Sequence, residues 1–142
     1  MKVKLKRINE NFLLEASGKN DTPVYIDNSS EENPKGASPM ELLLMGVGGC
    51  SAIDVISILK KQRQEITAYD VEVTGERHVE KEAKVFTAMH VIIYLEGQIT
   101  PEKAIRAAAL SFDKYCSVSL TLAPSVAITH EIIVNGIHLP QS

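Results

Sequence analysis

The sequence predicts an α+β fold in which most strands pair in an antiparallel way. Two kinds of segment predict it: short stretches in which polar and apolar residues alternate, and one long apolar stretch with helical boundaries. The expected order is three strands, a long helix, two strands, two helices and a last strand. Strands and helices do not alternate one by one in this order, as they would in a doubly wound parallel sheet. Because no internal repeat or linker interrupts this order, residues 1–142 are expected to form a single domain.

Three short strands are predicted near the N-terminus. Val3 to Lys6 alternates with period two, and the apolar Phe12 to Leu14 follows a polar turn, so these two segments are expected to form a hairpin. Val24 to Ile26 predicts the third strand. The polar segment 27–37 that follows is expected to be a loop.

A long helix is predicted from Met40 to Leu59. Ser38 can cap it, Pro39 suits its first turn, and Glu41 lies three residues after the serine, as in a capping box. The helix is apolar nearly all round, which predicts that it is buried rather than laid on a surface.

Three glycines at positions 46, 48 and 49 disfavour this helix, each by roughly 1 kcal/mol relative to alanine. They directly precede Cys50, one of two cysteines in the chain. A missing Cβ allows another backbone, or a substrate, to approach the helix closely. The glycines therefore predict either tight helix packing or access to the thiol, and both can hold together.

The second half of the chain predicts further strands and helices. Tyr69 to Thr74 alternates polar and apolar residues, and Val85 to Leu95 is apolar on both faces, as in a central strand. Thr100 to about Tyr115 predicts a second helix, and Cys116 to Pro124 a short third one. Val126 to Val134 is expected to be the last strand.

Composition excludes several classes of partner. The 15 Lys and Arg against 18 Asp and Glu give a net charge of −3, which predicts no general attraction to nucleic acid or to an anionic membrane surface. Basic residues near the start argue against a signal peptide, and no uncharged apolar run approaches the ~20 residues of a membrane span. The expected compartment is the cytoplasm, where thiols are kept reduced and paired cysteines are more often catalytic or redox-sensing than structural.

The two cysteines are the main candidates for chemistry. Cys50 lies in the middle of the long helix with Asp54 four residues on, hence on the same side. The alternative is that Cys50 is an inert core residue and Asp54 a structural carboxylate bonded to backbone donors. Cys116 lies at the junction of two helical segments, where a helix N-terminus would favour its ionisation; the alternative is a buried junction residue. If the two thiols meet, a sulfenic acid formed on one can be resolved to a disulfide by the other.

No metal site is expected. The four histidines have no ligand spacing with the cysteines, and the chain has no CxxC motif. His130 falls on the apolar face of the last predicted strand, so a satisfied core histidine is expected there.

Two segments resemble a known family. "SPMELLLMGVGGCSAIDVISILKKQRQ" (38–64) resembles the central helix of the OsmC/Ohr family, the osmotically inducible and organic hydroperoxide resistance proteins. "FDKYCSV" (112–118) resembles the second-cysteine motif of that family. The amino-acid sequences of both segments are most similar to its YhfA-type branch. The resemblance implies an OsmC-like fold with antiparallel sheets, a long buried central helix and an intertwined homodimer.

The resemblance also implies an activity. Enzymes of this family are thiol-dependent peroxidases acting on organic hydroperoxides, which implies a peroxidatic Cys50 and a resolving Cys116. An external thiol or lipoyl reductant would return the disulfide to the dithiol, with no bound cofactor or metal.

At one position the chain differs from the residue pattern of the family's peroxidases. Peroxidases of the family carry a glutamate ten residues before the first cysteine, paired with an N-terminal arginine. Met40 stands at that position, so Glu41 is the catalytic candidate, and Arg7 or the more distant Arg77 would supply the cation. The alternative function is a redox-sensing or small apolar ligand-binding dimer without efficient peroxidase turnover.

Overall fold

The structure is a computed structural model and describes residues 1–141. Its contacts divide the chain into two compact units, Met1–Leu43 and a second unit that begins at Leu44. The single domain expected over 1–142 stays a prediction. The units contain mixed helices and sheets, so the predicted α+β class is confirmed.

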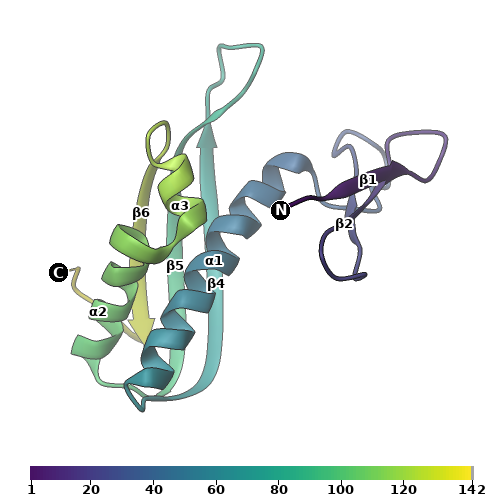
Figure 1. The fold of residues 1–142 in the computed structure, drawn as a ribbon. Helices are drawn as coiled ribbons and strands as arrows, with labels where there is room; N and C mark the ends of the chain where they lie inside the picture. The colour runs from purple at the N-terminus through teal and green to yellow at the C-terminus, as the bar shows by residue number, and fades with distance from the viewer. Residues whose placement is uncertain (142) are drawn as a thin grey trace. The chain divides into compact units, whose positions relative to one another are not determined.

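The first unit contains an antiparallel sheet of three strands in the order β1-β2-β3 (Figure 1). The strands are β1 (Lys4–Arg7), β2 (Leu14–Ser17) and β3 (Val24–Ile26). Residues 12–14 were expected to be strand, but β2 begins only at Leu14. The reason is a turn: the Asn9 side chain accepts hydrogen bonds from the backbone N–H groups of Asn11 and Leu13.

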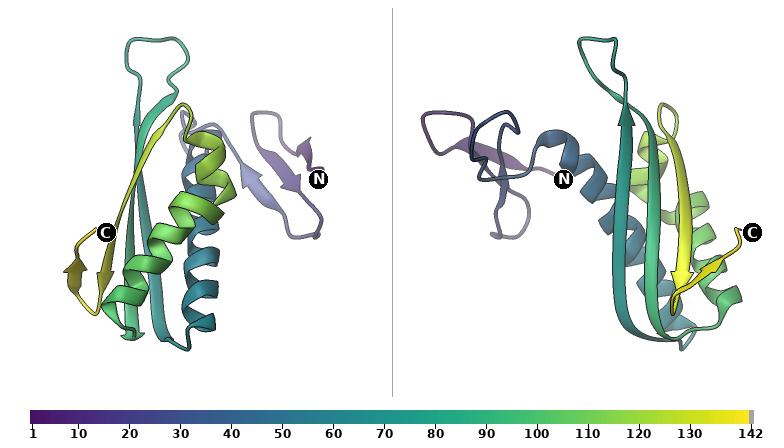
Figure 2. Two further views of the ribbon diagram at one scale, coloured as in Figure 1. Left: turned by 60° about the vertical axis from the view of Figure 1, so that its left-hand side comes forward. Right: turned by 180° about the vertical axis from the view of Figure 1, so that it is seen from behind.

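The second unit contains a four-stranded sheet in the order β4-β5-β6-β7. The strands are β4 (Glu65–Arg77), β5 (Phe86–Gln98), β6 (Ala127–Val134) and β7 (Ile137–Leu139). The pairs β4–β5 and β6–β7 are antiparallel, whereas β5 and β6 are parallel. Helical segments along one face of the sheet connect that parallel pair (Figure 2). The predicted mostly antiparallel pairing and the central position of β5 are confirmed.

The sequence reasoning missed strand β7. Asn135 and Gly136 form a two-residue turn between β6 and β7, with φ of 49° and 78°. Such turns require positive φ at both positions, which asparagine and glycine tolerate best. The Asn-Gly pair was the available signal for a hairpin.

The long helix α1 (Pro39–Lys61) is buried on one side and exposed on the other. Val47, Val55 and Leu59 are fully buried, whereas Met45 and Ile53 are 56% and 71% exposed. The expected burial of the helix holds for the face that carries Val47, Val55 and Leu59, and the opposite face stays exposed in the single chain.

By length and composition alone α1 could cross a membrane, a possibility that the sequence reasoning had excluded. The core helix of a soluble protein passes the same test. Its buried residues make α1 part of the core of this fold.

The second predicted helix changes its winding before it ends. Helix α2 (Pro101–Leu110) is followed by one π-helical turn, η1 (Ser111–Tyr115), and then by α3 (Ser117–Leu122). The expectation of one helix to Tyr115 misses this change of winding. Single π turns inside helices are frequent at functional sites.

Candidate functional site

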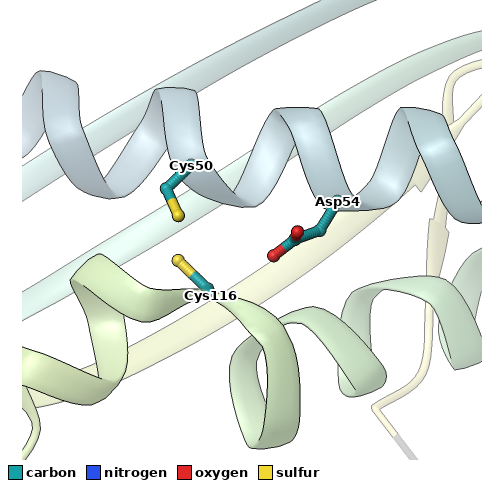
Figure 3. Close-up of side chains that lie close together, drawn as sticks. All are labelled: Cys50, Asp54 and Cys116. Carbon is teal, nitrogen blue, oxygen red and sulfur yellow. The ribbon is translucent and has the colours of Figure 1, made fainter.

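The two cysteine sulfurs face each other between α1 and the segment that joins η1 to α3 (Figure 3). Cys50 and Asp54 project from successive turns of α1, and Cys116 is the residue between η1 and α3. The two sulfur atoms and a carboxylate oxygen of Asp54 all lie within 4.8 Å of one another. Both cysteines are free thiols. Folding therefore brings together the two thiols that the sequence analysis selected.

Glycines allow α1 to approach its neighbours. A Cβ at Gly48 would lie 3.0 Å from Val73 Cγ2 on β4, and a Cβ at Gly46 would lie 3.4 Å from Val118 Cγ1 on α3. Near Gly49, by contrast, no heavy atom of the described chain lies within 4 Å of an added Cβ. Gly46 and Gly48 therefore provide the tight packing that was predicted, and Gly49 leaves open space beside the helix.

The π turn directs Cys116 toward α1. Its closing hydrogen bond runs from the Cys116 backbone N–H to the Ser111 carbonyl oxygen, at 2.7 Å. The buried Ser111 hydroxyl, at the start of this turn, donates to Asp54 Oδ2 at 3.0 Å. The carboxylate is therefore held by a side-chain hydroxyl in this structure, whereas the sequence analysis had considered backbone donors.

Cys116 is the buried member of the pair. It is fully buried, and its Sγ lies 3.0 Å from Ser119 Oγ in a hydrogen bond. Burial raises the pKa of the Cys116 thiol, while the Ser119 hydrogen bond lowers it in part. Of the two expectations for Cys116, the structure supports the buried junction residue rather than a thiol that a helix N-terminus ionises, because desolvation is the largest effect and α3 is only 6 residues long.

Cys50 retains some exposure to solvent. Cys116, by contrast, is fully buried, so Cys50 is the more exposed member of the pair. A partly exposed thiol next to a buried one is the arrangement expected of an attacking and a resolving cysteine.

Tyr69 is a polar residue of this region that the sequence analysis missed. Its hydroxyl, on β4, is buried and has no hydrogen-bond partner within residues 1–141. Burial raises the pKa of Tyr69 far above its usual value, and the negative charge of Asp54 raises it further. The sequence did offer a signal for Tyr69. It lies in the same alternating strand as Val71 and Val73, and the side chains of these two valines contact α1.

An open groove of about 460 Å³ is lined by Asp54, which also belongs to the cluster with the two thiols, although neither cysteine lines the groove itself. Ile58 and Leu110 give the groove apolar walls, and Lys61 and Gln62 contribute polar groups. The remaining lining residues are Ser57 and Tyr115. The groove could admit a molecule that combines an apolar body with a polar end.

Glu41 performs the capping role that its spacing predicts. The Ser38 N–H donates to Glu41 Oε2 at 2.7 Å, and the Glu41 N–H donates to Ser38 Oγ at 3.2 Å. The Glu41 side chain is exposed. Its catalytic role stays a prediction.

The two candidate arginines are both exposed and both bond to backbone carbonyls near them. Arg7 donates to Asn11 and Glu10, as expected for a solvent-facing strand residue. Arg77 donates to the Lys84 carbonyl at 2.6 Å and lies over the Phe86 ring, 6.0 Å from its centroid. These contacts do not assign either arginine to Cys50.

The histidines lie in other environments. His130 stacks on Phe112 with ring centroids 4.5 Å apart, and burial lowers its pKa. His90 and His138 both contact Glu131, at 3.3 and 2.9 Å. The group whose ligand atoms converge to within 4.8 Å, as a metal would require, is Cys50, Asp54 and Cys116.

Comparisons with known proteins identify a family and a fold. A family model described as OsmC-like protein matches residues 31–131. Protein YhfA of Escherichia coli strain K12 is 44% identical over 108 residues, which cover 75% of this chain and 78% of YhfA.

Two solved structures share the fold. An OsmC-like protein from Mycoplasma pneumoniae superposes with a TM-score of 0.80 at 14% identity, over 94% of this chain and 95% of that one. An organic hydroperoxide resistance protein from Legionella pneumophila superposes with a TM-score of 0.63 at 13% identity, over 92% of this chain and 94% of that one.

Proposed function

This chain belongs to the OsmC-like protein family, and we propose that it is a thiol-dependent peroxidase that reduces organic hydroperoxides through Cys50 and Cys116. Family membership supports a general role in stress response and redox chemistry. The observation that carries the specific activity is the approach of two free thiols to within 4.8 Å, one partly exposed and one buried.

The first step uses the partly exposed sulfur. The Cys50 thiolate attacks the terminal oxygen of the hydroperoxide, an S–O bond forms, and the O–O bond breaks. The organic fragment leaves as an alkoxide and takes up a proton to become the alcohol. Cys50 is thereby oxidised by two electrons to a sulfenic acid.

The second step uses the buried sulfur. Cys116 attacks the sulfur of the Cys50 sulfenic acid, an S–S bond forms, and the hydroxide leaves as water with the proton of Cys116. Burial of Cys116 keeps this thiol away from the oxidant, while its position beside Cys50 favours rapid resolution. An external dithiol, either a small thiol or a lipoyl group, then returns two electrons and restores both thiols.

The adjoining groove supports an organic rather than a purely inorganic peroxide. Its apolar walls, Ile58 and Leu110, can bury the organic fragment, and Asp54, which lines the groove, lies within 4.8 Å of both sulfurs. No bound cofactor is needed for this cycle, since the reductant and the hydroperoxide supply the electrons and the oxidising equivalent.

A homodimer is part of the proposal. OsmC family proteins are commonly dimeric. The exposed Met45 and Ile53 on α1 are large apolar side chains that a second copy of the chain could cover. We place the protein in the cytoplasm, where the reductant pool keeps paired thiols reduced between turnovers.

The second candidate function is a redox-sensing or small apolar ligand-binding dimer without efficient turnover. Met40 favours it, because the glutamate that the family resemblance places at that position is missing. The raised pKa of Cys116 also favours it, because a thiol that ionises poorly would resolve the sulfenic acid slowly. A sensor would form the same disulfide once per oxidation event rather than in a repeated cycle.

Steady-state consumption of cumene hydroperoxide distinguishes the two functions. With dithiothreitol or a lipoylated protein as reductant, the wild-type chain is expected to turn over many times, and Cys50→Ser is expected to lose this activity. The matched control is Ser117→Ala, a substitution on the exposed side of the same junction, which should retain turnover. Equal rates in wild type and Cys50→Ser would reject the peroxidase, and a single turnover per chain would favour the sensor.

A further inference from the structure

We propose that the reduced site also binds one zinc ion through Cys50, Asp54 and Cys116, and that bound zinc protects the thiols from oxidation. The binding part is independent of the catalytic cycle. The protective effect on turnover rests on the proposed peroxidase function. Zinc would act here as a reversible inhibitor rather than as a cofactor of the reaction.

The distances within the cluster suit a thiophilic ion. Zinc binds thiolate sulfur at about 2.3 Å and carboxylate oxygen at about 2.0–2.2 Å, so tetrahedral ligand atoms lie roughly 3.5–3.8 Å apart. The three ligand atoms already lie within 4.8 Å of one another. Side-chain shifts of about 1 Å or less would therefore complete the coordination.

The ligand types select the metal. Two thiolates and one carboxylate favour zinc over magnesium or calcium, which prefer oxygen ligands throughout. Cys50 and Asp54 are four residues apart on α1, the spacing with which one helical face presents two ligands to zinc in the H-E-x-x-H motif. The sequence spacing did not reveal the site, because the third ligand comes from a distant segment.

Hydroxyl groups already orient two of the three ligands. Ser111 donates to one carboxylate oxygen of Asp54, which leaves the other oxygen free to bind a metal. Ser119 lies 3.0 Å from the sulfur of Cys116. Such supporting hydrogen bonds fix ligand orientation in metal sites, and their loss usually weakens binding about 10- to 100-fold.

The fourth coordination position would be filled by water. The Tyr69 hydroxyl, buried in the same region and without a hydrogen-bond partner among residues 1–141, could bond to such a water. Binding would release the protons of both thiols to the solvent, and each sulfur would form one bond to zinc. A disulfide uses both sulfurs, so zinc binding and oxidation exclude each other.

The test measures zinc binding first and its effect on the thiols second. Reduced wild-type protein, dialysed against Zn²⁺, is expected to retain one ion per chain, and the disulfide form is expected to retain none. Cys50→Ser, Cys116→Ser and Asp54→Asn should each weaken binding at least tenfold (on the order of the loss seen for altered metal sites). Asp70→Asn, an exposed aspartate on β4, is the matched control for the last variant and should bind normally.

Two further measurements make the assignment specific. Co²⁺ in place of zinc is expected to give a sulfur-to-metal charge-transfer absorption that is reduced in Cys50→Ser and absent in a Cys50→Ser/Cys116→Ser double variant. His138→Gln, which removes a histidine from the surface group with Glu131 and His90, should not change binding. Loss of the ion in His138→Gln, or its retention in a Cys50→Ser/Cys116→Ser double variant, would overturn the proposed site.

The protective effect has its own readout. One equivalent of zinc is expected to slow alkylation of Cys50 by iodoacetamide, because a metal-bound thiolate is no longer free to attack, whether or not the protein reduces peroxides. Unchanged alkylation in zinc-loaded protein would overturn the protection. If metal-free protein fails to consume cumene hydroperoxide while zinc still protects Cys50, the peroxidase proposal fails and the zinc site stands.

Discussion

Replacement of Tyr69 by phenylalanine is expected to stabilise the protein. The substitution removes only the hydroxyl, which is buried and has no hydrogen-bond partner among the described residues. An unsatisfied buried polar group costs about 1–3 kcal/mol relative to the same group in water. The ring itself stays in place, because phenylalanine fills nearly the same volume.

The expected size of the effect follows from the length of the chain. For 142 residues, a change of 1 kcal/mol moves the melting temperature by about 3 °C. Tyr69→Phe should therefore melt about 3–9 °C above wild type when both are reduced, metal-free and at one protein concentration. Concentration must be held constant because a dimer melts at a temperature that depends on it.

The control is the same chemical change at an exposed site. Tyr115 is 49% exposed, and Tyr115→Phe should change stability by no more than about 0.5 kcal/mol. A raised pKa also means that the native state keeps the Tyr69 proton while the unfolded chain loses it above about pH 10. Wild type should therefore lose stability above that pH more steeply than Tyr69→Phe. An unchanged or lowered melting temperature in Tyr69→Phe would refute the reasoning, because it would show that the hydroxyl has a partner in solution.

Three further predictions concern packing and titration. Gly48→Ala should have a lower melting temperature than Gly46→Ala, because the new Cβ at position 48 would lie 3.0 Å from Val73. Overpacking costs about 1–3 kcal/mol, whereas the higher helix propensity of alanine contributes about 1 kcal/mol. Equal melting temperatures of the two variants would contradict the close approach of α1 to β4. In a Cys50→Ser background, Ser119→Ala should raise the pKa of Cys116 further, because it removes the hydrogen bond between Ser119 and the Cys116 sulfur. The absorbance of the thiolate should then develop at higher pH, and an unchanged titration curve would show that this hydrogen bond does not act on the thiol. Burial lowers the pKa of His130, so the unfolded chain takes up a proton first and stability is lost as the pH falls below about 6.5. His130→Gln should show a shallower loss in denaturant titrations between about pH 7 and pH 5, a range that spans the usual value of about 6.5, and an identical slope would contradict this.

Local sequence patterns predicted most of the fold. The capping box at Ser38 and Glu41 located the start of α1 to within one residue, because side-chain and backbone groups one turn apart satisfy each other. The alternating and apolar segments located β4 and β5, although both strands extend beyond the predicted bounds. The exposed side of α1 was not predicted, since the composition of a helix does not say how many of its faces the same chain covers.

The candidate site was predicted only in part. Cys50 and Asp54 share one helical face by spacing alone, and the glycines indicated a close approach. The hydroxyls of Ser111 and Ser119 could not be assigned to the site, because their positions depend on a π turn that helical periodicity does not reveal. The two interpretations of Cys116 could not be separated from the sequence, because its burial comes from tertiary packing rather than from the helix that it precedes.

The central claim is that the sulfurs of Cys50 and Cys116 form one redox unit that a hydroperoxide oxidises. Intact mass spectrometry of reduced protein, treated with one equivalent of cumene hydroperoxide, tests it directly. We expect loss of two hydrogen atoms in wild type, with a Cys50–Cys116 disulfide in the peptide map, and gain of one oxygen atom at position 50 in Cys116→Ser. An unchanged mass in wild type, or oxidation that leaves both cysteines as free thiols, would contradict it.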